Sequence, residues 1–149
     1  MIEAKVTLTH PESTSRQFEV SNGRGHTLLV DDAQGNTGPK PIELVAVALA
    51  GCTAFDVIGV LRKKRQKVTG YEVRVTAEQA PDPPQVFTRV QIVHRVTGEN
   101  IDRDAVAQAI HLSETKYCSV GAMVRKTAEI VTTFEIVPAD AGERVGAER

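Results

Sequence analysis

The chain has 149 residues, the size of a typical single domain, and its hydrophobic and charged fractions of 41% and 25% are those of a globular protein. Its net charge of -1 and aromatic content of 4% argue against a nucleic-acid-binding protein, which needs a basic surface and often stacking side chains. We therefore expect one domain over residues 1–149 that binds no nucleic acid.

The N-terminal part predicts three short strands, at residues 6–9, 18–20 and 27–30, with turn residues between them. A polar loop follows over residues 31–40. The first residues alternate between polar and apolar and lack the basic-then-apolar plan of a signal peptide. We expect a cytoplasmic protein on this ground.

Apolar residues at helical spacing predict a long helix from Pro41 to about Arg65. Pro41 suits a first helical turn, and Glu43 suits the positive end of the helix dipole. The uncharged stretch, residues 44–55, is shorter than the roughly 20 residues that a membrane span requires. The sequence therefore predicts a buried core helix and no membrane contact.

This helix is apolar on nearly every face, which is typical of a helix enclosed on all sides. A chain of this size struggles to wrap one helix completely, so a partner subunit is the natural cover and we expect a homodimer. The alternative is a monomer with the sheet on one face of the helix and a second helix on the other.

After Gly70 the period changes to that of strands, which are expected around residues 71–76 and 86–96 with a stiff proline-rich connection between them. A second helix begins at Asp102 or Arg103, and a short helical segment follows Cys118. The last strand covers residues 130–136, and the tail from Pro138 is expected to fray. Strands and helices are segregated along the chain, which favours an α+β fold over repeated βαβ units.

Two cysteines, Cys52 in the long helix and Cys118 after the second helix, are the main candidates for chemistry. Without a signal peptide they are expected in a reducing compartment, as a redox pair, catalytic groups or inert buried thiols. Small neighbours, Gly51 and Ser119, would permit a close approach. A helix dipole at Cys118 would favour the thiolate there, so the residues alone nominate Cys118 as the nucleophile.

Two carboxylates on the long helix are weaker candidates. Asp56 follows Cys52 by four residues and shares its face, although a structural ion pair or a cap to a neighbouring loop is the commoner role for such a carboxylate. Glu43 precedes Cys52 by nine residues and lies on the opposite face, so it would reach the site only through a partner helix or an irregular first turn. His94 is predicted to be a core histidine. No pair of histidines or cysteines has a metal-binding spacing, and we expect neither a metal nor a cofactor.

Several segments together resemble the OsmC/organic hydroperoxide resistance superfamily, in its OsmC-like branch. The resemblance rests on GPKPIEL at residues 38–44, AGCT at 50–53, Asp56-Val57, LRKKR at 61–65 and LSETKYCSV at 112–120. It covers almost the whole chain. It implies an α+β fold with antiparallel sheets around a long buried helix, an intertwined homodimer and two sites at the subunit interface.

The same resemblance implies a thiol-dependent peroxide reductase acting on organic hydroperoxides. Cys52 would be the peroxidatic thiol and Cys118 the resolving thiol, and a small dithiol or a lipoyl-linked protein would restore both. Enzymes of the family carry a glutamate ten residues before the first cysteine, where this chain has Ile42 and then Glu43. They also use an arginine from the N-terminal strands, for which Arg24 and Arg16 are the candidates.

Two other functions stay open. In one, the dimer binds a small apolar or thiol ligand, or senses redox state, without turnover. In the other, the protein is a structural dimer with inert thiols.

Overall fold

The computed structural model describes residues 1–139, and these fall into two compact units that divide after Val45. The first contains a small sheet, and the second contains most of the long helix and a larger sheet.

The N-terminal unit is a three-stranded antiparallel sheet of β1 (Ala4–Leu8), β2 (Phe18–Asn22) and β3 (Thr27–Val30). The strands appear where the sequence predicts them, to within two residues. The Asn22 side chain closes the β2–β3 turn, because its Oδ1 accepts hydrogen bonds from the backbone N–H groups of Arg24 and His26.

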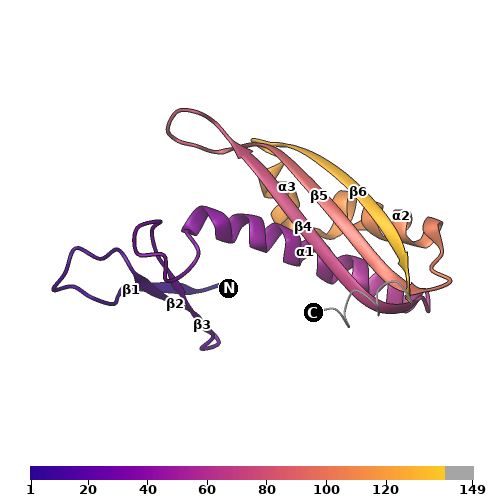
Figure 1. Ribbon diagram of the computed structural model, residues 1–149, viewed down its shortest axis with the longest axis horizontal. Coiled ribbons are helices and arrows are strands. Elements are labelled where there is room, and N and C mark those ends of the chain that lie inside the picture. Colours follow the sequence, from indigo (N-terminus) through magenta and orange to yellow (C-terminus); the bar gives the residue numbers. More distant parts are fainter. Residues whose placement is uncertain (140–149) are drawn as a thin grey trace. The chain divides into compact units, whose positions relative to one another are not determined.

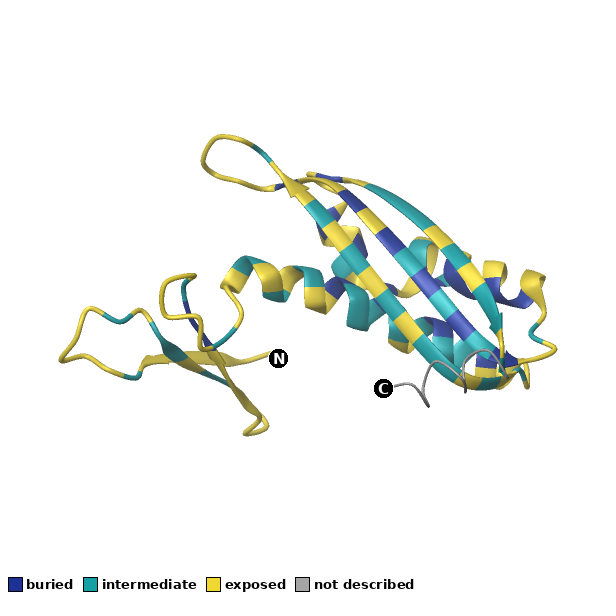
Figure 2. Cartoon of the chain, in the orientation of Figure 1, coloured by how far each residue is buried: buried dark blue, intermediate teal, exposed yellow. Residues whose placement is uncertain are grey.

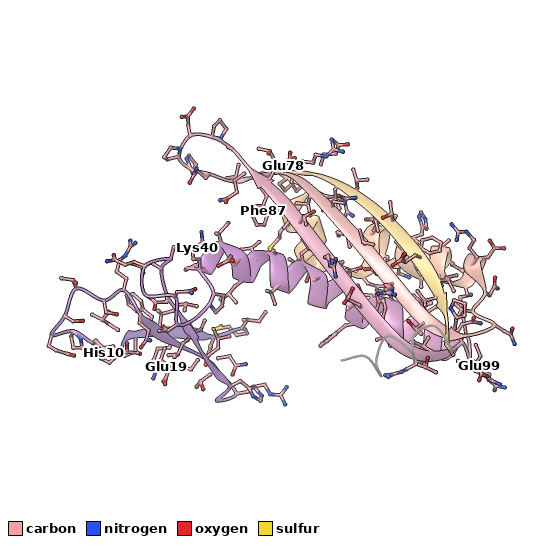
Figure 3. The ribbon with its side chains drawn as sticks, viewed as in Figure 1. His10, Glu19, Lys40, Glu78, Phe87 and Glu99 are labelled. Carbon is pink, nitrogen blue, oxygen red and sulfur yellow. The ribbon has the colours of Figure 1, made fainter. Side chains whose placement is uncertain are left out.

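The second unit contains a three-stranded sheet of β4 (Lys67–Gln79), β5 (Phe87–Glu99) and β6 (Glu129–Pro138). β4 and β5 form an antiparallel hairpin, and Figure 3 marks its two ends with Glu78 and Phe87 at one and Glu99 at the other. β6 runs parallel to β5, so this sheet is mixed, whereas the family resemblance implied antiparallel sheets. The helical connection between β5 and β6 carries the chain back to the starting end of β5, as a parallel pair requires (Figure 1).

One face of this sheet is buried, and the alternation is clearest on β5 (Figure 2). Its core side chains are Val90, Ile92, His94 and Val96, all at most 3% exposed. These side chains face helices, because Val96 packs in the main core cluster together with residues of the long helix and of the helix that follows β5. The helical connection therefore covers the same sheet face as the long helix.

The long helix α1 (Pro41–Lys63) begins at the predicted residue and ends two residues early. At its start, the Glu43 carboxylate accepts a hydrogen bond from the Lys40 N–H at 2.9 Å, which caps the first turn. At its end, Arg65 has φ +56°, and the N–H groups of Arg65 and Gln66 bond back to the carbonyls of Arg62 and Leu61. This is a Schellman ending with arginine in the left-handed position that glycine usually takes.

Within residues 1–139, only one side of α1 is buried. Leu49, Thr53, Val57 and Leu61, spaced four residues apart, are at most 3% exposed. Phe55 on another side is 81% exposed. The described residues of one chain therefore do not enclose the helix on every side as predicted, and the homodimer stays a prediction.

Three helical pieces connect β5 to β6: α2 (Arg103–Leu112), a π-helical turn η1 (Ser113–Tyr117) and α3 (Ser119–Val124). Asp102 caps α2 by accepting from the Asp104 N–H, in agreement with the predicted start. Pro138 ends β6 paired with Gly98, so the tail does not begin there as expected. The rest of the predicted frayed tail, residues 140–149, lies outside the described residues.

Candidate active site

The fold brings the two cysteines together although they are far apart in the chain. Cys52 lies in the middle of α1, and Cys118 is the residue that precedes α3. Their Sγ atoms and a carboxylate oxygen of Asp56 all lie within 4.8 Å of one another. Because a disulfide has an S–S distance of about 2.0 Å, a side-chain movement on the order of 2–3 Å would join the two sulfurs.

The π-helical turn sets the position of Cys118. The Cys118 N–H donates to the Ser113 carbonyl at 2.9 Å, five residues back, which closes the turn and ends the helical run begun by α2. The Cys118 Sγ then accepts from the Gly121 N–H at 3.3 Å and caps α3. A Cβ added at Gly121 would lie 3.2 Å from this sulfur, so glycine leaves room for it.

A small network of hydroxyls holds Asp56 beside the thiols. Ser113 Oγ lies 2.9 Å from Asp56 Oδ2 and 3.0 Å from Thr53 Oγ1, and both Ser113 and Thr53 are buried. A carboxylate only accepts hydrogen bonds, and serine has one proton to give. Ser113 therefore donates to Asp56 and accepts from Thr53, which leaves Asp56 Oδ1 free of this network.

The Cys118 thiol is held in its protonated form. Burial is the main cause that raises its pKa to about 11, and the nearby Cys52 sulfur and the charge of Asp56 act in the same direction. The Gly121 N–H acts against them but is the smaller effect. The expectation that the dipole of α3 favours a Cys118 thiolate is therefore wrong: α3 has six residues and burial of the sulfur outweighs its field.

A second buried polar pair lies on the core face of the sheet. The Tyr71 hydroxyl is 2.7 Å from His94 Nδ1, and their rings are stacked with centroids 6.0 Å apart. Burial lowers the pKa of His94 to about 4, so the ring is neutral and Tyr71 donates to Nδ1. The prediction of a core histidine is confirmed. Burial, with a smaller contribution from the Asp56 charge, raises the pKa of Tyr71.

The other predicted site residues belong to the N-terminal unit. Glu43 caps the start of α1, the alternative role that the sequence left open. Arg24 is exposed in the β2–β3 turn, and Arg16 pairs with Asp32 at 2.9 Å. A contribution of Glu43 or Arg24 to the site stays a prediction.

The sequence did not single out the residues that hold Asp56. Ser113 and Thr53 are ordinary hydroxyl residues in helical sequence, and their pairing depends on α1 packing beside the end of α2. A weak signal was available, since Thr53 adjoins Cys52 and Ser113 stands inside the same motif as Cys118.

Comparison with known proteins decides the family. The family model for OsmC-like proteins matches residues 33–133 of this chain. The chain belongs to the OsmC-like family. The protein YhfA of Escherichia coli K12 is 41% identical over 122 residues, which cover 82% of this chain and 91% of YhfA.

Solved structures of the OsmC-like fold agree with this assignment. A hypothetical protein from Aquifex aeolicus has a TM-score of 0.81 and 25% identity, with 93% of this chain and 97% of that one covered. The organic hydroperoxide resistance protein OhrB of Bacillus subtilis has a TM-score of 0.60 and 15% identity over 91% of this chain and 98% of its own. The second likeness is one of fold alone.

The long helix of this OsmC-like protein is also long and apolar enough to cross a membrane, by length and composition only, with a mean hydropathy of 2.2. Its buried side chains, however, pack into the core of the second unit, together with α2 and β5. One side of the helix therefore belongs to the core of the second unit.

Proposed function

We propose that this protein is a thiol-dependent reductase of organic hydroperoxides, with Cys52 as the peroxidatic and Cys118 as the resolving cysteine. The observation that carries the proposal is the convergence of both sulfurs with Asp56 inside 4.8 Å. The family supports it, since some structural neighbours are named organic hydroperoxide resistance proteins.

The first step divides the roles of the two thiols. The Cys52 thiolate attacks the peroxide oxygen, the O–O bond breaks, and the products are a Cys52 sulfenic acid and an alcohol after the alkoxide takes a proton. Burial raises the pKa of Cys118 and keeps that thiol protonated. This arrangement favours Cys52, not Cys118, as the thiol that attacks first. Arg24 and Glu43 remain the predicted helpers of this step.

The second step needs a base beside Cys118. The Cys118 sulfur attacks the sulfenic sulfur, the S–S bond forms, the S–O bond breaks and hydroxide leaves as water. Asp56 is held by Ser113 and lies within 4.8 Å of both sulfurs, so its carboxylate can take the Cys118 proton and pass it to the leaving hydroxide. A dithiol reductant, either small or lipoyl-linked, then exchanges with the disulfide and restores both thiols.

Exposed apolar side chains beside the cysteines favour an alkyl peroxide as substrate. Phe55 is three residues from Cys52 on α1, Tyr117 precedes Cys118, and Met123 lies on α3. They are 81%, 51% and 65% exposed. In a single chain these surfaces are open to water, and we propose that a homodimer in the cytoplasm covers part of them and completes an apolar pocket.

A second candidate function is redox sensing without turnover. It is favoured by the position of Glu43, whose carboxylate is engaged as the cap of α1. In that case peroxide would oxidise the pair once, and the disulfide itself would be the signal.

Consumption of cumene hydroperoxide with dithiothreitol as reductant separates these functions. We expect many turnovers for the wild type, none for Cys52→Ser, and for Cys118→Ser weak turnover or arrest as a sulfenic acid that dimedone traps. Asp56→Asn should slow disulfide formation but not the first oxidation, and Asp82→Asn, in an exposed loop, is its matched control. Turnover by Cys52→Ser at the wild-type rate would overturn the proposal, and oxidation that stops after one equivalent would identify a sensor.

A further inference from the structure

The cluster of Cys52, Asp56 and Cys118 has a second chemical capacity that does not depend on peroxide. Two sulfur atoms and one carboxylate oxygen, from two separate segments, lie within 4.8 Å of one another. We propose that the reduced protein binds one Zn²⁺ ion here, with both thiolates and an Asp56 oxygen as ligands and the fourth position open to water.

The spacing of the ligand atoms suits this ion. Tetrahedral zinc has Zn–S bonds of about 2.3 Å and Zn–O bonds of about 2.0–2.2 Å, which puts neighbouring ligand atoms roughly 3.5–3.8 Å apart. Starting from the present upper bound of 4.8 Å, a contraction on the order of 1 Å closes the site around the ion. Cys52 and Asp56 are one helical turn apart on α1, so the same face supplies two of the ligands.

Hydrogen bonds from neighbouring residues already orient two of the proposed ligands. The Ser113 hydroxyl holds Asp56 Oδ2, which orients the carboxylate and leaves Oδ1 available to a metal. On the other side, the Gly121 N–H donates to the Cys118 sulfur at 3.3 Å and would stabilise a metal-bound thiolate. Cys52 and Asp56 are only half-buried, so an ion can enter from solvent.

Charge also favours a cation. With both thiols ionised, the cluster would hold three negative charges, and within residues 1–139 no ion pair involves Asp56. A divalent ion neutralises most of this charge, and binding releases the two thiol protons to solvent. Soft sulfur ligands with one carboxylate select zinc over calcium or magnesium, which prefer oxygen ligands.

The three proposed ligands do not follow a standard metal-binding spacing in the sequence. Two of its ligands are separated by one helical turn, and the third follows two strands and a helix later. The sequence predicted no metal for that reason. The inference depends on the folded position of Cys118 and is independent of the proposed peroxide chemistry.

Cobalt binding tests the site directly, since Co²⁺ substitutes for Zn²⁺ and has visible absorption. Titrating the full-length reduced protein with Co²⁺ should give one ion per chain, with tetrahedral ligand-field bands and thiolate-to-cobalt charge transfer that Zn²⁺ abolishes. Cys118→Ser should halve the charge-transfer intensity. Asp56→Asn should weaken Zn²⁺ binding on the order of 10- to 100-fold, while Asp82→Asn should leave it unchanged. Protein oxidised to the disulfide should not bind.

Alkylation gives a second measurement that needs no absorption. A stoichiometric amount of Zn²⁺ should slow iodoacetamide labelling of both cysteines in the wild type, and far less in Asp56→Asn. Absence of the cobalt bands, or equal affinity in the wild type, Asp56→Asn and Cys118→Ser, would overturn the site. Binding that needs both cysteines but not Asp56 would contradict the three-ligand arrangement. Because neither measurement uses peroxide, an inactive reductase would leave these results unaffected.

Discussion

The burial of His94 predicts that the free energy of unfolding falls in acid, by an amount that can be assigned to this one side chain. It is fully buried on β5, its Nδ1 accepts from the Tyr71 hydroxyl, and its Nε2 has no hydrogen-bond partner in the described part of the chain. Burial lowers the pKa of His94 from 6.5 to about 4. The folded protein therefore keeps the ring neutral over a pH range in which the unfolded chain charges it.

The sign and size of the effect follow from proton linkage. Between about pH 6.5 and pH 4 the unfolded state binds one more proton than the folded state, so the free energy of unfolding falls as the pH falls. The pKa shift corresponds to a loss of about 3 kcal/mol across this window, with no further loss from His94 below it. Such a loss is a large share of the stability of a typical domain.

The variant His94→Asn isolates this contribution. Its side-chain oxygen can still accept from Tyr71, but it does not titrate. Urea unfolding of both proteins at several pH values should show the wild type losing about 3 kcal/mol more than the variant between pH 7 and pH 4. His111→Asn, at an exposed position on α2, is the control and should follow the wild type. Parallel curves for the wild type and His94→Asn would refute the assignment.

Three further predictions follow from named features of the fold. Arg65→Gly should raise the free energy of unfolding by up to about 1 kcal/mol, because Arg65 has a left-handed backbone conformation with φ +56°. A lower free energy of unfolding in Arg65→Gly would contradict the Schellman ending of α1. Ser113→Ala should cost about 1–3 kcal/mol in urea unfolding by leaving Asp56 without its donor, whereas exposed Ser119→Ala should change less than about 0.5 kcal/mol. Sedimentation should give a dimer mass that Phe55→Asp lowers toward one chain; a wild-type monomer would refute the dimer.

The elements of this fold were largely predictable from local patterns. The strand alternation on β4 and β5, the long apolar run of α1 and the Asp102 cap of α2 are properties of short stretches of sequence, so these elements were identified. The strand bounds were less accurate, since β4 covers Lys67–Gln79 where residues 71–76 were predicted. The direction of β6 was not, because it depends on where a helical connection ends in space. The early end of α1 was missed since arginine seldom adopts the left-handed conformation of Arg65.

In the candidate site, too, some residues could be predicted from the sequence and others depend on tertiary packing. The sequence alone singled out Cys52 and Cys118, the resemblance to the family assigned their roles, and helical spacing put Asp56 on the face of Cys52. The hydrogen-bond partner of Asp56 could not be predicted from the sequence, because Ser113 contacts Asp56 only when the end of α2 packs on α1. The expected thiolate at Cys118 failed because the dipole argument considered the helix end and not the burial of the sulfur, which raises the pKa of this thiol.

The closeness of the Cys52 and Cys118 sulfur atoms underlies the proposed redox chemistry, and one measurement tests it most directly. Reduced native protein is treated with one equivalent of cumene hydroperoxide, and its intact mass and cross-linked peptides are then determined. The proximity of Cys52 and Cys118 predicts a chain lighter by two hydrogen atoms, with the two cysteine peptides joined within one chain. Thiols that stay open to alkylation under these conditions, or disulfides formed only between chains, would contradict it.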